Sequence, residues 1–489
     1  MLTPGEIKAL IDKDAASEKK QQAKKGLQYY ECGHDIKEYR IFFVNADGQL
    51  QEDKTKSNIK ISHPFLTELV DQKVQYMLSG KEAYGGLRYI KSDIPELQGE
   101  LDTRFNENDE FNAELYEALT DASVNGFAYM YAYKDKDEKT SFQCADAMGV
   151  VEVRKDETAD GCDYVIYHYV DRIGKDNKKV KRIQVWDQQQ TYYYCQIDDG
   201  AIVLDESQEI NPRPHIIYKK DRDESTYFEG FGFIPFFVLP NNRKQFSDLK
   251  PIKTLIDDYD LMSCGLSNNI QDANETLYVV KGFDGELDEM MLNMKAKKHI
   301  SLPESGDVEI RTIDIPYQAR QAKLELDEKN IYRFGMGFNS SQLGDGNITN
   351  VVIKSRYALL DLKCNKMEIH LKNFFRKILK VVLKEINDQN GTDYRLSDVY
   401  FNLKREVMTN AADNAQIEFV DAQKQQVQIN TLLSLAYHLD NETLMQNICD
   451  VLDIEYEEIK DKLPKREEYD PYAAQTALDA VVPEGDMLE

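Results

Sequence analysis

Apolar residues recur at three- and four-residue steps in two segments near the middle of the chain. In the first segment, residues 249–275, they form one stripe on an otherwise polar surface. This pattern predicts an amphipathic helix about 40 Å long. Asp248 is its expected N-cap, and Pro251 is tolerated in a first turn. The second segment, residues 317–338, is more charged, has only a thin apolar line and predicts a returning helix.

A hairpin of two such helices exposes more apolar surface than it can cover by itself. Self-association is therefore our first hypothesis, and an antiparallel coiled-coil arm on a monomer is the alternative. Between the helices, residues 276–316 carry three short strand patterns, TLYVV, HISLP and VEIRTIDI, and one or two helical turns at residues 287–294. This segment is too small for a core of its own, so it also needs partners.

A longer helix, about 55 Å, is predicted for residues 350–388, after the polar, glycine-bearing loop 339–350. Its apolar residues are so dense that we expect burial on more than one side. Asn390 and Gly391 supply the stop. Two further helices are expected at residues 410–438 and from residue 440 onward, followed by an acidic tail that we expect to be disordered.

The first half of the chain changes from a helical to a strand-like period. A capping box at Thr3 opens a helix that we expect to reach residue 30, and further helices are predicted at residues 63–79 and 93–125. Asn45 to Gly48 reads as a hairpin turn. Alternation over residues 127–218 predicts one antiparallel meander with an aromatic face. The predicted fold class is α+β and predominantly helical.

Composition narrows the class of protein. Hydrophobic residues make up 42% of the chain and charged residues 30%, which are the values of a soluble globular protein. No apolar run approaches the roughly 18 residues that span a bilayer, and the N-terminal sequence lacks the apolar core of a signal peptide. The seven cysteines are scattered singly, so we expect reduced thiols and no zinc or iron–sulfur site.

No sequence motif points to catalysis. The chain has no GxxxxGK[ST] loop, no GxSxG and no HExxH, and Gly230 and Gly232 lack the third glycine of a dinucleotide-binding fingerprint. Each of the seven histidines is isolated along the sequence, so a structural or solvated role is expected. We therefore expect no catalytic residue, no cofactor and no metal ion, and an enzyme is the weaker class, although a site assembled in space stays open.

The formal charge of −26 argues against tight, non-specific binding of nucleic acid, which depends on Lys and Arg. It is compatible with a protein that lets DNA pass without gripping it, and equally with simple solubility. A small basic cluster between the hairpin helices and the polar loop at residues 339–350 are the candidate elements for a polyanion. Their bland alternatives are a solvated face and an ordinary connector. The candidate DNA-channel residues are Lys281, Lys295, Lys297, Lys298, Asn347, Thr349 and Asn350.

An ordered set of motifs resembles the portal (head–tail connector) proteins of tailed bacteriophages, of the type common in long-tailed phages of Gram-positive bacteria. The resemblance covers most of the chain, and no single short motif carries it. The matching segments are YYECGHDI (29–36), IKISHPFLTELVDQKVQYMLSG (59–80), residues 108–112, NGFAYMYAY (125–133), the long stretch 234–282 and the helical pair around residues 440–443.

This resemblance implies a portal-type fold in a ring of twelve subunits at one capsid vertex. In that fold the wing combines helices with an antiparallel sheet, the stem is a long-helix hairpin, the clip is a small α/β cap and the crown is helical. The implied regions are the N-terminal wing (1–248), outgoing stem helix (249–276), clip (277–313), returning stem helix (314–338), tunnel loop (339–350), long wing helix (351–395) and crown with acidic tail (396–489).

The resemblance also implies a function. A portal of this kind is a non-enzymatic conduit through which double-stranded DNA is packaged, retained and ejected. The implied partners are the terminase large subunit, the major capsid and scaffolding proteins, and a head-completion or adaptor protein, with no membrane contact. The expected location is the virion, after assembly in the cytoplasm of the bacterial host. The alternative is a structural adaptor or minor capsid protein without DNA contact, and a nuclease or other enzyme is the third class.

Overall fold

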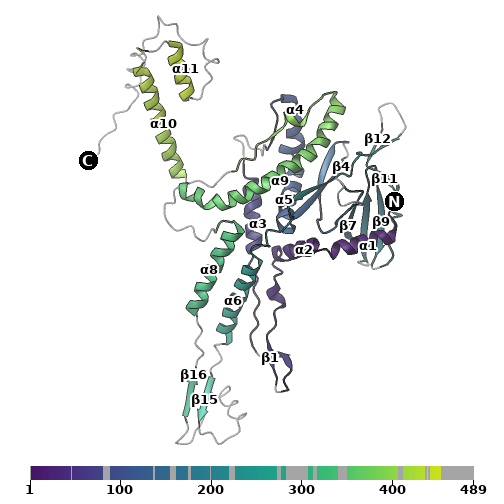
Figure 1. Ribbon diagram of the computed structural model, residues 1–489, viewed down its shortest axis with the longest axis vertical. Helices are drawn as coiled ribbons and strands as arrows, with labels where there is room; N and C mark the ends of the chain where they lie inside the picture. The colour runs from purple at the N-terminus through teal and green to yellow at the C-terminus, as the bar shows by residue number, and fades with distance from the viewer. Residues whose placement is uncertain are drawn as a thin grey trace, which may run out of the picture. The chain divides into compact units, whose positions relative to one another are not determined.

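The computed structural model describes most of the chain as two compact units. One unit comprises residues 1–343 and 356–406, and the other comprises residues 344–355 and 407–489 (Figure 1). The described residues are 2–452, except for positions 46, 55 and 199 and the segments 81–88, 136–137, 155–160, 174–177, 220–225, 273–276, 282–306, 312–316, 340–349, 406–410, 436–437 and 439–440.

The N-terminal region holds two helices where the sequence predicted one. Helix α1 (Pro4–Ala15) begins with the expected capping box at Thr3, and α2 (Glu18–Tyr30) follows it. Ser17 separates them, because its hydroxyl accepts the backbone N–H of Lys20 and so caps a new helix. The prediction of one continuous helix was wrong because the apolar period runs through this cap.

Helix α3 (Phe65–Met77) confirms the second predicted helix. The third prediction, a single helix over residues 93–125, was wrong. The chain there forms α4 (Pro95–Leu101), a five-residue π-helical turn (Asp102–Asn106) and α5 (Asp109–Asn125). Asn108 starts the last helix anew, because its side chain accepts the N–H of Phe111.

The predicted single meander is divided among separate sheets. A three-stranded sheet has the order β14-β4-β5, and its central strand pairs with a partner more than a hundred residues later in the chain. A six-stranded antiparallel sheet runs β10-β9-β8-β7-β6, with β11 also on β9, while β12 and β13 form a ribbon of their own. The strands are β4 (Phe127–Lys134), β5 (Thr140–Ala145), β6 (Val150–Val153), β7 (Tyr164–Ile173), β8 (Lys178–Trp186), β9 (Gln190–Ile197), β10 (Val203–Leu204), β11 (Arg213–Pro214), β12 (Ile216–Lys219), β13 (Thr226–Glu229) and β14 (Phe236–Pro240).

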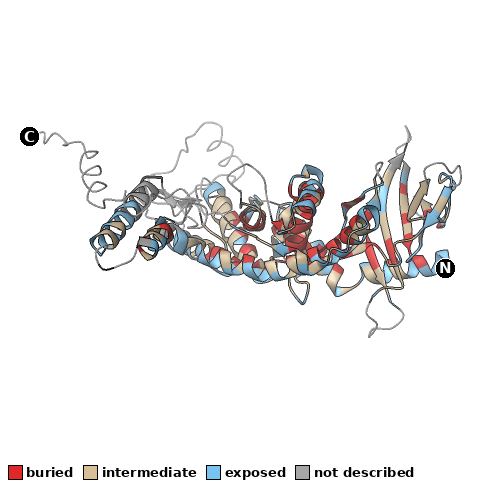
Figure 2. Cartoon of the chain, turned by 90° about the horizontal axis from the view of Figure 1, so that it is seen from above, coloured by how far each residue is buried: buried red, intermediate tan, exposed pale blue. Residues whose placement is uncertain are grey.

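Aromatic side chains join the two larger sheets. The ring of Tyr131 on β4 lies 5.8 Å from that of Trp186 on β8 and 5.4 Å from that of Phe236 on β14. Tyr167 on β7 lies within 6.1 Å of the same tyrosine ring. The high aromatic content of this region therefore serves core packing, as the sequence indicated. Buried residues lie in the two larger sheets and equally in α3 and α5, at the centre of the first unit (Figure 2).

The predicted hairpin turn at residues 45–48 is confirmed by its flanking strands. β1 (Phe42–Val44) pairs antiparallel with β2 (Leu50–Glu52), and Gly48 takes the left-handed conformation with φ +78°. A second small pair joins β3 (Ile90–Lys91) to β17 (Tyr400–Phe401).

The two helices of the predicted central hairpin are α6 (Lys253–Asp272) and α8 (Tyr317–Gly335). They pack side by side, and β15 (Leu277–Lys281) and β16 (Asp307–Arg311) form an antiparallel pair beyond their far ends (Figure 1). HISLP and residues 287–294 lie outside the described residues. We use the word stem for α6 together with α8.

Helix α6 begins later than predicted, and Asp248 is not its N-cap. The chain first makes tight turns, in which the N–H groups of Ile252 and Lys253 both bond to the carbonyl of Leu249. The carboxylate of Asp248 instead pairs with Lys73, at 3.0 Å, and with another lysine from the helix that follows the stem. The Asp248 carboxylate is therefore held by these two lysines, away from the first turn of α6.

The long helix after the stem, α9 (Asn350–Asn390), confirms its prediction, and Gly391 (φ +67°) ends it by donating its N–H to the carbonyl of Asn387 at 2.8 Å. Within one copy, however, its described residues are buried along one broad face, from Leu360 to Ile386. The expected burial on more than one side was therefore wrong for a single chain.

In the second unit, α10 (Ala411–Ser434) and α11 (Asn441–Leu452) pack against each other, which confirms the two predicted helices. The predicted acidic tail lies outside the described residues. Among the helices that the structure describes, none combines the length and the apolar composition needed to cross a membrane.

Candidate functional site

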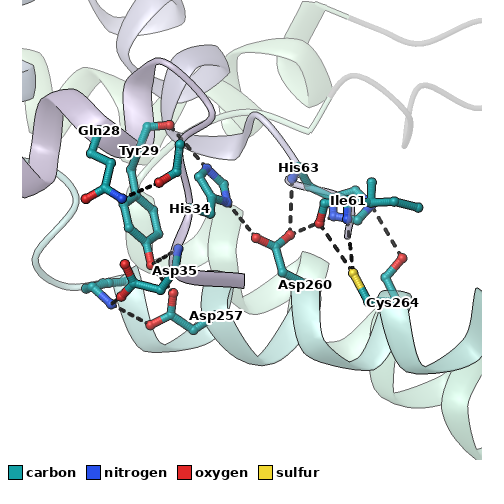
Figure 3. Close-up of polar contacts among 12 residues, drawn as sticks. Gln28, Tyr29, His34, Asp35, Ile61, His63, Asp257, Asp260 and Cys264 are labelled. Carbon is teal, nitrogen blue, oxygen red and sulfur yellow. Dashed lines mark hydrogen bonds and ion pairs between the residues drawn. The ribbon is translucent and has the colours of Figure 1, made fainter. Parts of the chain in front are cut away.

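The inner end of the stem is fixed by one buried carboxylate. Asp260, on α6, accepts hydrogen bonds from Nδ1 of His34 at 2.5 Å and from Nδ1 of His63 at 2.7 Å (Figure 3). The side chains of Asp260 and His34 are fully buried, and that of His63 is 25% exposed. Burial alone would raise the pKa of Asp260, but the two histidines outweigh it and hold the pKa below its ordinary value.

The contacts of His34 indicate that this cluster has a structural role. The ring of His34 stacks on Tyr29 at 4.4 Å, and its second nitrogen lies 3.2 Å from the carbonyl oxygen of the same tyrosine. Both ring nitrogens are therefore engaged. Within the described ranges, no group of three or more His, Cys, Asp or Glu side chains could hold a metal ion. The histidines are isolated along the sequence, but Asp260 joins two of them in space.

An extended segment, residues 57–63, lies along α6 and is bonded to it at every second residue. The backbone N–H groups of Ser57, Ile59, Ile61 and His63 point to side chains spaced four residues apart on the helix. Two residues of extended chain and four residues of helix both span about 6 to 6.6 Å, so the register is kept. The partners, in order, are Asp272 Oδ1 (3.1 Å), Asn268 Oδ1 (2.6 Å), Cys264 Sγ (3.1 Å) and Asp260 Oδ1 (3.1 Å).

We call residues 57–63 the strap. The sequence interpretation missed it, because a segment without its own period gives no pattern to read. A signal was present on the other partner: the polar positions 260, 264, 268 and 272 form a second stripe on α6 at four-residue steps. Such a stripe indicates that a polar, backbone-rich partner covers that side of the helix.

The other side of α6 packs on α8 and α3. Lys323 of α8 bridges Asp258 and Asp327. Phe65 of α3 makes edge contacts with Tyr259 at 4.9 Å and with Tyr332 at 6.0 Å. The stem therefore leaves the body of the first unit from a rigid base of ion pairs and aromatic contacts.

Large apolar side chains of the stem nevertheless stay exposed. Their exposed fractions lie between 40% and 55%, far above those of the core residues. Both helices contribute, and the exposed side chains extend over most of the length of the pair. The residues are Leu261, Ile270, Tyr317, Leu326 and Phe334. Exposed apolar surface of this kind marks an interaction site, so the stem surface is a candidate subunit interface.

Helix α9 is held to the same unit by buried charges. Asp248 lies between Lys73, whose side chain is 2% exposed, and Lys363 of α9 at 3.1 Å. Burial would raise the pKa of Asp248, but the charges of Lys363 and Lys73 hold it well below its ordinary value. Further along α9, the carboxylate of Glu385 forms ion pairs with Nη1 of Arg104 at 2.7 Å and with Nζ of Lys134 at 2.6 Å.

The structure does not test the candidate channel residues. Lys281 is the last residue of β15, where its backbone pairs with Asp307, and Asn350 is the first residue of α9. Nothing is described of their side chains. The remaining candidates, Lys295, Lys297, Lys298, Asn347 and Thr349, lie outside the described residues.

Comparison with known proteins identifies the family. Residues 10–471 match the model for "Phage portal protein, SPP1 Gp6-like". The chain belongs to this phage portal protein family. It is similar to the portal protein of Bacillus phage SPP1, with 29% identity over 349 residues, which cover 70% of this chain and 66% of that protein. It is also similar to the portal protein of Clostridium phage phiCD119, with 25% identity over 425 residues, covering 84% and 88%.

These matches confirm the resemblance seen in the sequence. The two relatives come from phages of Bacillus and Clostridium, which are Gram-positive hosts. The mixed helix and sheet content agrees with the expected α+β class. A portal-family chain with an uncovered stem is the observation on which the functional proposal rests.

Proposed function

We propose that this chain assembles into a ring that serves as the portal of a phage capsid, the channel through which double-stranded DNA is packaged, retained and ejected. The family match over residues 10–471 supports this function. The single structural observation that carries it is the stem, whose large apolar side chains are about half exposed in one copy. Neighbouring copies around a ring would cover them.

The proposed regions follow the family order. α6 and α8 form the stem, and the β15–β16 pair belongs to the clip. The proposed boundaries are wing 1–248 and 351–395, stem 249–276 and 314–338, clip 277–313, tunnel loop 339–350 and crown 396–489, in a ring of twelve.

The protein acts as a conduit and not as a motor. Hydrolysis of ATP takes place on the terminase large subunit, which docks on the portal together with capsid, scaffolding and head-completion proteins. The ring sits at one vertex of the virion after assembly in the host cytoplasm. A net charge of −26 per copy repels phosphate and lets a duplex slide.

The first experiment is imaging of the purified protein by negative-stain electron microscopy. Rings with a central hole are expected, and a monodisperse monomer at all salt concentrations would overturn the proposal. Replacing Phe334 and Leu326 with Ser should shift rings toward monomers, because both side chains are more than half exposed on the stem. The matched control is the same change at Leu435, which is 43% exposed on a different unit.

A second experiment separates a channel from an adaptor. The triple variant Lys295→Glu, Lys297→Glu and Lys298→Glu should still form rings but impair DNA packaging or retention. A structural adaptor without DNA contact would tolerate it. Deleting residues 340–346 should likewise spare the ring and impair packaging, and an unchanged phage yield from both variants would refute the channel.

A further inference from the structure

The outward face of α9 is divided into an apolar half and a basic half. Leu359, Leu362 and Ile369 are 40%, 53% and 62% exposed. Four exposed lysines, one between Leu362 and Ile369 and three after Ile369, lie within about 60° of one another around the helix axis. We call them the basic face: Lys366, Lys377, Lys380 and Lys384. Over the described part of the chain, none of these four is recorded in an ion pair or a hydrogen bond.

This arrangement costs free energy within one copy. Lysines at three- and four-residue steps repel each other by about 0.2 to 0.5 kcal/mol per pair. The chain as a whole carries a charge of −26, so another copy offers many carboxylates to such a face. A partner with carboxylates would remove the repulsion. The apolar half of the same face favours a protein over a nucleic acid, because phosphate backbones offer nothing for Leu359 or Ile369 to bury against.

Helix α5 offers the opposite pattern. It contains five acidic residues and no basic residue. Four of its carboxylates lie within about 60° around the axis. We call them the acidic face: Glu110, Glu114, Glu117 and Asp121. Burial, and after it the charges of Asp146 and Glu117, raise the pKa of Asp121 to about 7. Glu114 accepts the backbone N–H of Cys144 on β5 at 2.6 Å, so Glu110 and Glu117 are the exposed members of this face.

The charged residues of the two faces have matching spacings when the two helices are antiparallel. Steps of three and four residues separate successive lysines at 377, 380 and 384, and the same steps separate the carboxylates at 117, 114 and 110. Three antiparallel charge pairs would extend over about 10 Å of helix. The matched positions are Lys377 with Glu117, Lys380 with Glu114 and Lys384 with Glu110.

Each face borders a different cavity of the first unit. Lys380 and Lys384 line a cavity of about 520 Å³ whose opposite wall includes β12 and β13. Glu110 and Glu114 line one of about 340 Å³ against β5. Both cavities reach the β4–β5 hairpin, at Asp135 and Thr140, but no ion pair joins the two faces among the described residues. Two copies can bring together what one copy keeps apart.

We propose that the basic face of α9 in one copy binds the acidic face of α5 in the next copy. This inference rests on the proposed ring and names the contact that closes it. Two different surfaces of one chain make a head-to-tail interface, and such an interface generates a ring when the rotation closes. The apolar residues of α9 continue the same contact beside the charge pairs.

The test uses charge reversal in two variants. The first carries Lys377→Glu and Lys384→Glu, and the second carries Glu110→Lys and Glu117→Lys. Each variant alone places like charges across the interface, so rings should need a roughly tenfold or higher protein concentration. Combining all four changes in one chain, or mixing the two variants, restores opposite charges at each contact and should restore the rings.

The controls separate this inference from the proposed function. Lys8→Glu with Lys13→Glu makes the same change of charge on α1, where both lysines are exposed, and should leave rings intact. Circular dichroism melting checks that every variant is folded. If the unmodified protein forms no ring, the proposed function fails. If it forms rings and both reversed variants do so equally well, only the α9–α5 contact is overturned. Rings of normal stability that retain less DNA in the first variant alone would assign the basic face to DNA, which also overturns the proposal.

Discussion

Replacing Asp260 with Ala should weaken the stem base strongly. The carboxylate accepts three N–H groups, from the ring of His34 and from the ring and backbone of His63. The alanine leaves all three without an acceptor. His34 is fully buried, so its orphaned N–H costs about 1 to 3 kcal/mol, while His63 can partly turn to water. We therefore expect the free energy of unfolding to fall by about 3 to 5 kcal/mol.

The matched control is Asp258→Ala, two residues earlier on the same helix. Its partner Lys323 and the carboxylate are both more than a third exposed, so this pair contributes less than about 1 kcal/mol. Denaturant unfolding followed by circular dichroism measures both losses. Hydrogen exchange of the strap amides at Ile59 and Ile61 should accelerate in Asp260→Ala and stay slow in the control. Equal losses in the two variants would refute a special role for the buried carboxylate.

The effect of this site should also depend on pH. The pKa of Asp260 is lower in the folded chain than its ordinary value of 3.8, so the folded state favours the ionised form. Its stabilising contribution is complete above about pH 4 and is lost as the pH falls through the folded pKa. The stability difference between the wild-type protein and Asp260→Asn should therefore shrink below pH 4. A difference that grows in acid would contradict this sign.

Three further predictions concern the body of the first unit. Asp248→Asn leaves Lys73 and Lys363 without their counterion, so unfolding in denaturant should be easier by about 3 to 5 kcal/mol, and an unchanged midpoint would contradict the ion-pair account. Asp121→Asn should raise the melting temperature at pH 8 but not at pH 4, because a folded pKa of about 7 makes this carboxyl group destabilising as the pH rises from about 4 through 7. Equal changes of melting temperature at the two pH values would count against this account. Gly126→Ala should lower the free energy of unfolding by about 2 kcal/mol or more, because the φ of Gly126 is +92° and a Cβ there would lie 2.2 Å from the carbonyl oxygen of Gln245. A neutral result in the same denaturant assay would show that the loop moves aside.

The sequence predicted those elements whose signal is local. The stem helices and α9 carry a long apolar period, and the two helices of the second unit do as well, so their existence and order are confirmed. The predicted helix boundaries were wrong where a single polar side chain caps a new helix. Ser17 and Asn108 each cap a new helix inside a segment that the apolar period treats as continuous.

The partners of the strands could not be predicted in the same way. Alternation marks β4 as a strand, but the register that pairs Tyr129 with Val238 depends on packing between residues far apart in sequence. The candidate interface likewise has parts that a local sequence pattern predicts and parts that it does not. The apolar stripe of α6 predicted an uncovered hairpin, whereas the strap and the charged pairs at its base depend on tertiary contacts that no local pattern contains.

The distribution of charged and apolar side chains in one copy is itself an argument for assembly. Single exposed apolar residues are normal on a monomeric protein, whereas a buried charge or an extended exposed apolar surface needs an explanation. Here Asp260 and Lys73 are buried in the body, while Phe334 and Ile369 are more than half exposed on the stem and on α9. The buried charges fix the helices rigidly with respect to their own unit, so the exposed apolar side chains are presented at fixed positions. A rigid surface of this kind loses little conformational entropy when another copy covers it, and it favours a closed ring over irregular aggregation.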